Sequence, residues 1–229
     1  YFNSLLDAGV SKFTVSIHSH LAHVEDDLTG TPDSFNKKVA GLKLLIEFQR
    51  QGRLPHGLHL NPVLNSRNFK GLSAYIGYFH RIGINSIHFN FIGGCLYMWP
   101  LGARLRRSRL MPTYAEVVPY LLDAICRYRP TKYPELRFRF EDIPVCVLPW
   151  NGNSPRMMRQ IADRYFGNME SHSWISFGRL QIEWDRFVRE QFKTKKSACR
   201  GCAYHARCNG IIKTYADVHG ISEKGYPLC

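Results

Sequence analysis

The stretch that decides the fold is KFTVSIHS, residues 12–19, which alternates apolar and polar side chains and is rich in β-branched residues. This pattern predicts a β-strand. The segments HGLHLNPVL (56–64) and NSIHFNFI (85–92) have the same character, and ELRFRF (135–140) predicts one more strand.

Helical patterns lie between these strands. Apolar side chains recur at helical spacing over residues 35–50, which end before Gly52, and over residues 69–82, which end before Gly83. A third helix is predicted at 113–128, opened by the capping pair Thr113 and Glu116. The alternation of strand and helix predicts right-handed crossover units on a parallel sheet, an α/β fold.

The character of the sequence changes in its last third. NGNSPRMM (151–158) is rich in turn-forming residues, and the chain up to Lys196 shows no sustained period. We therefore expect a boundary near residue 130, with an α/β part at 1–130 and a smaller, irregular C-terminal module at 131–229.

Composition bounds the class of protein. The chain has 229 residues, of which 45% are apolar, and it contains no apolar run of the roughly 18 residues that a membrane span needs. The start, YFNSLLDAGV, lacks the features of a signal peptide, so we predict a soluble, cytoplasmic protein that does not enter a membrane. The formal charge of +13 favours an anionic partner, although an ordinary solvated basic surface is an open alternative.

Three cysteines lie close together in CRGCAYHARCNG (199–210). A C-x-x-C pair lets Cys199 and Cys202 approach one metal from a tight turn, and Cys208 can close the same site. A reducing compartment disfavours disulfides, but the spacing does not separate zinc from iron and sulfide. The fourth ligand is open between Cys146 and Cys229, with His205 as a further choice for zinc.

A second group of candidates follows from the predicted sheet. Ligands of parallel α/β sheets gather at the carboxyl ends of the strands, so side chains there face a site. A local turn or strand-end hydrogen bond is the alternative for each of them. The candidates are Ser16, His18, Asn61, Asn65, Asn90 and Gly93, with Gly94 beside the last.

These segments, taken in order, carry a resemblance to a known family. From LLDAGVSKFTVSIHS (5–19) through LTGTPDSF (28–35), NPVLNSRN (61–68) and INSIHFNFIGG (84–94), the chain resembles the second half of the core of radical S-adenosylmethionine (radical SAM) enzymes. EDIPVCVLP (141–149) and the cysteine run up to Gly220 are similar to the auxiliary iron-sulfur modules of that superfamily, of the SPASM or twitch type.

The resemblance implies a fold, cofactors and ligands. The fold would be the C-terminal part of a partial (β/α)6 TIM-like barrel, with Ser16 and Asn65 near the carboxylate and ribose of S-adenosyl-L-methionine and Gly93 packed against its nucleoside. An auxiliary 4Fe-4S cluster would be bound by Cys146, Cys199, Cys202 and Cys208. The C-x-x-x-C-x-x-C motif of the first 4Fe-4S cluster is not in the sequence, so we expect a truncated, inactive fragment whose second 4Fe-4S cluster belongs to a missing N-terminal part.

The resemblance also implies partners. The substrate would be a peptide, a protein or a small molecule, with an acidic leader peptide as one candidate, and the electron donor a flavodoxin or ferredoxin. The competing hypothesis is a zinc-containing nucleic-acid-binding α/β protein, supported by the positive charge.

Overall fold

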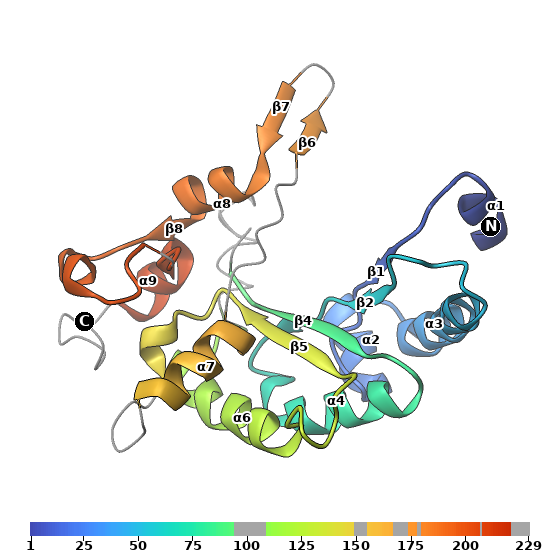
Figure 1. Ribbon diagram of the computed structural model, residues 1–229, viewed down its shortest axis with the longest axis horizontal. Helices are drawn as coiled ribbons and strands as arrows, with labels where there is room; N and C mark the ends of the chain where they lie inside the picture. The colour runs from blue at the N-terminus through green and yellow to red at the C-terminus, as the bar shows by residue number, and fades with distance from the viewer. Residues whose placement is uncertain (94–108, 149–154, 167–173, 178–179, 207, 221–229) are drawn as a thin grey trace. The chain divides into compact units, whose positions relative to one another are not determined.

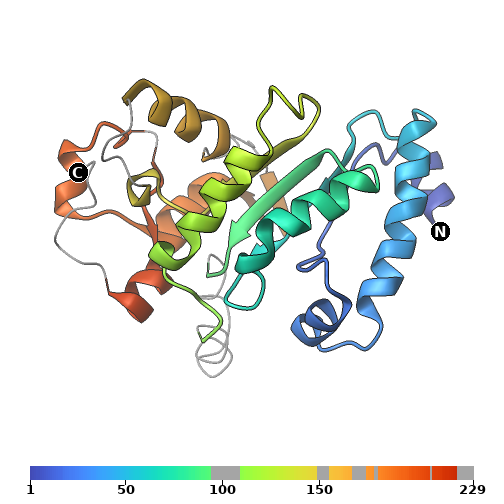
Figure 2. The same ribbon diagram turned by 90° about the horizontal axis from the view of Figure 1, so that it is seen from below.

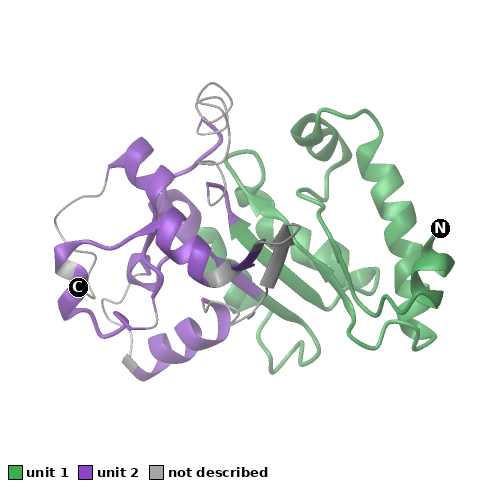
Figure 3. Cartoon of the chain, turned by 90° about the horizontal axis from the view of Figure 1, so that it is seen from above, with its two compact units in different colours: residues 1–90, 119–138 green, residues 91–118, 139–229 purple. Residues whose placement is uncertain are grey.

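The computed structural model describes residues 1–93, 109–148, 155–166, 174–177, 180–206 and 208–220. The chain divides into two compact units, one of residues 1–90 and 119–138, the other of residues 91–118 and 139–229 (Figure 3). The boundary near residue 130, between the α/β part and the C-terminal module, stays a prediction. No helix in the described part of the chain is long and apolar enough to cross a membrane.

A five-stranded sheet lies mostly in the first unit, with residues 91 and 139–141 of its strands in the second (Figure 1). The first pair of strands is parallel, with Phe13 opposite Leu58 and Val15 opposite Leu60, and the next pair is parallel with Leu60 opposite Ile87. This confirms the mixed α/β fold with a parallel sheet. The strands are β1 (Phe13–Val15), β2 (Leu58–Leu60), β3 (Val63–Leu64), β4 (Ser86–Phe91) and β5 (Arg137–Glu141).

The helices follow the predicted alternation. The predicted apolar stripe of residues 35–46 is buried in α3, and Tyr75, Ile76 and Phe79 are buried in α4. The capping pair is also confirmed, because Thr113 N–H donates to Glu116 Oε2 (2.7 Å) and Glu116 N–H donates to Thr113 Oγ1 (3.2 Å). The helices are α1 (Phe2–Asp7), α2 (Ala22–Thr29), α3 (Ser34–Arg50), the short 3₁₀ helix η1 (Phe69–Gly71), α4 (Leu72–Arg81) and α6 (Tyr114–Arg127).

Strand order explains where the helices lie. β1, β2 and β4 follow one another across the sheet in chain order, and both β3 and β5 also pair with β4. When each right-handed crossover adds its strand on the same edge, the helices collect on one face, and α3 and α4 do lie on the same side of the sheet (Figures 1 and 2).

The two faces of the sheet differ in chemistry because successive strand residues point to opposite sides. In β4, Ile87 and Phe89 are buried in the core, while His88 and Asn90 are half-buried. In β2 the same alternation leaves His59 half-buried between two buried leucines. One face of the sheet is therefore apolar, and the other carries imidazole and amide groups.

The second unit is built from short elements around an aromatic centre. Tyr114 stacks on Tyr215 with ring centroids 3.9 Å apart, and Tyr215 Oη accepts the N–H of Tyr114 (3.1 Å). Nearby, the buried Lys193 pairs with Asp142. The elements beyond β5 are η3 (Val145–Val147), α7 (Pro155–Tyr165), the antiparallel pair β6 (Trp174–Phe177) and β7 (Leu180–Glu183), α8 (Trp184–Phe192), the antiparallel pair β8 (Lys193–Thr194) and β9 (Ile211–Ile212), η4 (Ser197–Gly201) and α9 (Lys213–His219).

Candidate functional site

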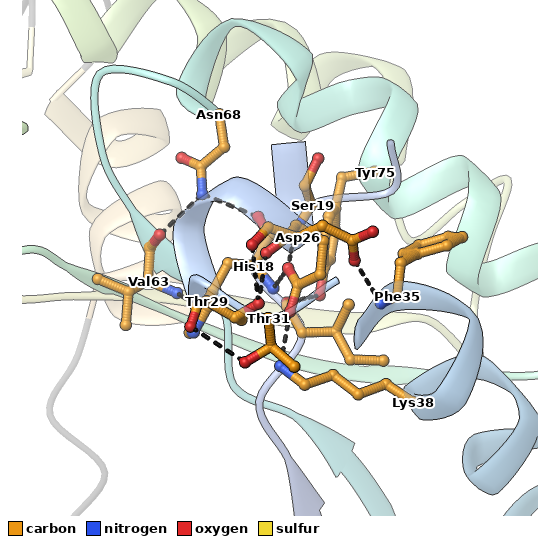
Figure 4. A network of polar contacts seen from close by, with 12 residues as sticks. His18, Ser19, Asp26, Thr29, Thr31, Phe35, Lys38, Val63, Asn68 and Tyr75 are labelled. Carbon is orange, nitrogen blue, oxygen red and sulfur yellow. Dashed lines mark hydrogen bonds and ion pairs between the residues drawn. The ribbon is translucent and has the colours of Figure 1, made fainter. Parts of the chain in front are cut away.

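The loop that follows β1 is anchored to a buried carboxylate. Glu25, in α2, is 0% exposed, and its Oε2 accepts the backbone N–H groups of His18 (2.6 Å) and Ser19 (2.9 Å). Its other oxygen binds Lys38 Nζ of α3 at 2.6 Å (Figure 4). Since a buried charge is costly unless it is paired and hydrogen-bonded, these three donors are what allow Glu25 to lie inside the protein.

Two more side chains hold the same loop. Asn68 Nδ2 donates to the carbonyl oxygens of His18 and Val63, both at 2.8 Å, and Tyr75 Oη donates to the carbonyl of Ile17 (2.7 Å) (Figure 4). The backbone of residues 17–19 is thus held by α2, by the residues before η1 and by α4. A loop held at so many points keeps its side chains in a fixed arrangement.

The loop between α2 and α3 is fixed by a side chain as well. Asp26 Oδ1 accepts the N–H of Phe35 (2.8 Å), and its Oδ2 accepts the N–H of Asp33 (3.0 Å). Asp26 therefore satisfies free N–H groups at the start of α3, as a capping residue does. This contact sets the position of α3 and hence of Lys38 relative to Glu25.

The imidazole of His18 receives a backbone hydrogen bond. Val63 N–H donates to Nδ1 at 3.1 Å. Burial lowers the pKa of His18, and the charge of Lys38 lowers it further, while the Glu25 carboxylate opposes them. Because a backbone N–H can only donate, Nδ1 is the acceptor and the neutral ring carries its proton on Nε2.

A small pocket lies beside this loop. Burial, and secondarily the charge of Arg81, lowers the pKa of His20, and burial raises the pKa of the Tyr75 phenol well above its usual range, with a further contribution from Glu25. The pocket therefore presents neutral imidazoles and a neutral phenol at pH 7. Among the residues that line it are His18, Ser19, His20, Asn68, Tyr75 and Phe89.

The structure places the predicted polar residues of the sheet as follows. Ser16 is exposed directly after β1. Asn90 Nδ2 donates to Asn61 Oδ1, so these two amides meet at the carboxyl end of β2. Asn65 is buried in a turn, where its Nδ2 donates to the carbonyl of Val63 (3.1 Å) and its Oδ1 accepts the N–H of Arg67 (3.0 Å).

The backbone conformation and the close packing at position 93 favour glycine. Its φ is +131°, and a Cβ there would lie 2.6 Å from Met111 Cε. Its carbonyl accepts a hydrogen bond from Thr214 Oγ1 at 3.3 Å. These contacts are all within the second unit. Gly94 lies outside the described residues.

The cysteine segment folds into consecutive turns. Cys202 N–H donates to the carbonyl of Cys199 (3.2 Å), and Cys208 N–H donates to that of Tyr204 (2.8 Å). The Sγ of Cys208 accepts the N–H of Gly210 at 3.3 Å. Burial raises the pKa of the Cys208 thiol, and the nearby thiols of Cys202 and Cys199 raise it further.

The candidate metal ligands that the structure describes are not assembled into one site. In the described residues, no group of three or more His, Cys, Asp or Glu side chains is arranged to hold a metal ion. Cys146 is half-buried in η3, and His205 Nδ1 lies 2.6 Å from the carbonyl oxygen of Cys199. Cys229 lies outside the described residues. The described part of the chain therefore shows no assembled metal site, and the cluster ligands stay a prediction.

Sequence reasoning missed the residues that hold the site together, namely Glu25, Lys38, Asn68 and Tyr75. In the sequence Glu25 belongs to the acidic run EDD (25–27), which reads as a solvated helix surface. Only the turn-forming context of Asn68 carried a local signal.

Comparison with known proteins adds no relative: no family model matches the chain, and no curated protein or solved structure matches it.

Proposed function

We propose that this chain is part of a radical SAM enzyme. Its first unit would contribute half of the core barrel, and its second unit would hold an auxiliary iron-sulfur cluster. The observation that carries the proposal is the strand order, in which β1, β2 and β4 are neighbours in chain order and β5 pairs with β4. A segment of a (β/α) barrel has this order, as does each half of a doubly wound sheet, and the resemblance to radical SAM enzymes favours the barrel.

The polar groups at the carboxyl ends of the strands support the same reading. Asn61 and Asn90 meet there, and the anchored loop after β1 carries Ser16 and His18. Amide, hydroxyl and imidazole donors suit the carboxylate and hydroxyl oxygens of S-adenosyl-L-methionine. That cofactor, together with a reduced 4Fe-4S cluster from a part of the protein outside these residues, would supply the radical chemistry when bound.

Asn65 and Gly93, both proposed to contact the cofactor, would in addition support the site. Asn65 would shape the turn from which Asn68 reaches the carbonyl of His18. Gly93 would allow the residues after β4 to pack closely within the second unit.

The cysteine segment supports the auxiliary cluster. A backbone N–H that donates to a cysteine sulfur, as Gly210 does to Cys208, stabilises a thiolate ligand. Cys146, Cys199, Cys202 and Cys208 would be the four ligands. Four protein ligands favour electron transfer or a structural role, and three would leave one iron open to substrate.

The wider setting follows from this proposal. The protein would act in the cytoplasm on a peptide, a protein or a small molecule, with electrons from a flavodoxin or ferredoxin. Its positive charge suits an acidic leader peptide as substrate.

Metal analysis after anaerobic purification tests the auxiliary site. We expect brown protein with iron and acid-labile sulfide, and we expect Cys199→Ser, Cys202→Ser, Cys208→Ser and Cys146→Ala each to reduce the iron content. Cys126→Ser is the matched control, because Cys126 is an exposed thiol of α6. Colourless protein that contains zinc and no sulfide, and binds nucleic acid with a steep salt dependence, would refute the proposal in favour of a nucleic-acid-binding protein.

A further inference from the structure

The sheet of the first unit has an apolar side and a polar side. On the apolar side Phe89 of β4 meets the ring of Tyr75 of α4, with centroids 5.5 Å apart, and α3 lies on that side as well (Figures 1 and 2). The opposite side carries the alternate strand residues. β1, β2 and β4 contain no acidic residue. We call this side the polar face, and among its residues are Lys12, Thr14, His59, Ser86, His88 and Arg137.

The strand register arranges part of the polar face in a row. Thr14 lies opposite His59, and Leu60 lies opposite Ile87, which places Ser86 beside His59. Paired residues of neighbouring strands point to the same side of a sheet, so the side chains of Thr14, His59 and Ser86 lie next to one another. Thr14 is exposed, and the other two are half-buried.

The centre of this row is held by hydrogen bonds. Ser86 Oγ lies 2.6 Å from His59 Nδ1, and the carbonyl oxygen of His56 lies 3.3 Å from His59 Nε2. Because a carbonyl oxygen only accepts, Nε2 carries the proton of the neutral ring, and Nδ1 accepts from Ser86. Burial is the main cause that lowers the pKa of His59, and the contact with His56 opposes it. The centre of the row is therefore neutral at pH 7.

Two cations flank this neutral centre. Lys12, directly before β1, is exposed, and its charge also lowers the pKa of His59, so its ammonium lies near the ring. On the other side Arg137 begins β5, and its N–H donates to the carbonyl of Asn85 (2.8 Å), beside the start of β4. The side chain of Arg137 is exposed, whereas the next residue, Phe138, is buried. Within the described residues neither Lys12 nor Arg137 forms an ion pair.

The separation of the two cations selects an extended ligand. Neighbouring strands lie about 4.8 Å apart, so β1 and β5, with β2 and β4 between them, are about 14 Å apart. A single carboxylate does not span that distance. An extended peptide rises about 3.3 Å per residue, so acidic side chains four positions apart point to the same side and are separated by about 13 Å. Such a peptide, crossing the strands, places one carboxylate near Lys12 and another near Arg137.

The groups of the polar face suit a peptide better than a nucleic acid. Single-stranded nucleic acids are bound by aromatic side chains on which the bases stack. In β1, β2 and β4 the phenylalanines alternate with the polar-face residues and belong to the apolar side. The imidazoles of His59 and His88 face each other, with centroids 5.6 Å apart. The exposed cations at the ends of the row suit carboxylates, which form strong charge-assisted hydrogen bonds.

We propose that the polar face binds an acidic peptide segment in extended conformation, with one carboxylate at Lys12 and a second at Arg137. The inference rests on the proposed function, because it names the surface on which an acidic substrate peptide lies. It goes further in selecting a peptide over a small molecule and in assigning the two contacts.

Fluorescence anisotropy with the 229-residue chain measures this binding. The probe is a fluorescein-labelled ten-residue peptide of alternating glutamate and alanine, and the comparison peptide has glutamine in place of every glutamate. We expect the acidic probe to bind, and the comparison peptide to bind at least about tenfold more weakly. Lys12→Gln and Arg137→Gln should each weaken binding of the acidic probe about threefold, as expected for exposed ion pairs.

The controls are Lys43→Gln and Arg50→Gln. Both residues are exposed cations of α3, which lies on the apolar side of the sheet, and each control removes the same charge as its counterpart on the polar face. We expect each control to stay within about 1.5-fold of wild type, because exposed charges beyond a Debye length are screened.

Equal weakening by the controls and by the polar-face substitutions would show attraction to the overall charge, and would overturn the inference. Failure of the acidic probe to bind would overturn it too, as would tighter binding of a ten-nucleotide oligothymidylate that Lys12→Gln and Arg137→Gln weaken. Metal analysis reads the proposed function separately. Iron and sulfide in a chain that does not bind the probe refute only this inference, whereas probe binding by a colourless zinc protein refutes the proposed function and leaves the polar face as a peptide-binding surface.

Discussion

The buried carboxylate of Glu25 makes the sharpest test of how the site is held. In Glu25→Gln the side chain keeps its shape and one acceptor oxygen, but its amide group must face either Lys38 Nζ or the backbone N–H groups of His18 and Ser19. Either orientation places donor against donor. Lys38 Nζ loses its partner in the first orientation, and the N–H groups of His18 and Ser19 lose theirs in the second.

The expected cost can be worked from these contacts. An unsatisfied buried donor costs about 1–3 kcal/mol, and the lost charge-assisted bonds add about 1–2 kcal/mol. Lys38 is 29% exposed and can turn part of its ammonium to water, which reduces the sum. We expect Glu25→Gln to lower the free energy of unfolding by about 2–4 kcal/mol.

The assay is urea denaturation followed by circular dichroism, together with hydrogen exchange of the amides of residues 18 and 19. Asp27→Asn is the control, because Asp27 forms an ion pair with Arg67 in which both side chains are more than half exposed, and we expect a cost below about 1 kcal/mol. Glu25→Gln combined with Lys38→Met should lose less than the sum of the single changes, because the donor-against-donor contact is gone. If Glu25→Gln costs no more than Asp27→Asn, with unchanged exchange at residues 18 and 19, the reasoning about this carboxylate is wrong.

Two further predictions concern pH and backbone geometry. Burial is the main cause that lowers the pKa of His18 in the folded protein. Between about pH 6.5 and this lowered pKa, the unfolded chain therefore binds a proton that the folded chain does not. The contribution of His18 to the free energy of unfolding is fully present above about pH 6.5 and is lost as the pH falls through this window. His18→Asn should flatten that dependence in urea titrations at a series of pH values, and an unchanged slope would count against the assignment. Gly210 has φ +91°, and a Cβ there would lie 2.2 Å from the carbonyl oxygen of Thr194. Gly210→Ala should therefore lower the free energy of unfolding of the second unit by about 2–4 kcal/mol. A Cβ at Gly201 would have no atom within 4 Å, so the control Gly201→Ala should change that free energy by less than about 0.5 kcal/mol. Equal thermal midpoints for the two glycine variants would contradict the role given to Gly210.

Much of the fold was predictable because it depends on local pattern. The strand at residue 13 was recognisable from alternation and β-branched residues, and α3 from its apolar period, since both features reflect which side of one element faces the core. The capping pair at Thr113 is local for the same reason: donor and acceptor lie three residues apart. The parallel pairing followed from the alternation of strands with helices long enough to cross over.

The site was predictable only in part. Asn61 and Asn90 were expected at strand ends, and they meet there, because the ends of neighbouring parallel strands lie together. Asn65 forms local hydrogen bonds in a turn, and its contact with a ligand stays a prediction. Its nearest donors and acceptors belong to residues two positions away, and local bonds of this kind compete with ligand contacts.

The sequence alone determined the elements, their order and the parallel sheet, together with the residues that can provide polar groups at its edge. Only the tertiary structure decided which of those groups are held by hydrogen bonds within the protein. Val63 reaches the ring of His18 across 45 positions of the chain, Asn68 reaches its carbonyl across 50, and Lys38 reaches Glu25 across 13. Burial and hydrogen bonding at such separations depend on how β1, β3, α2 and α3 pack, and no local pattern of residues encodes that packing.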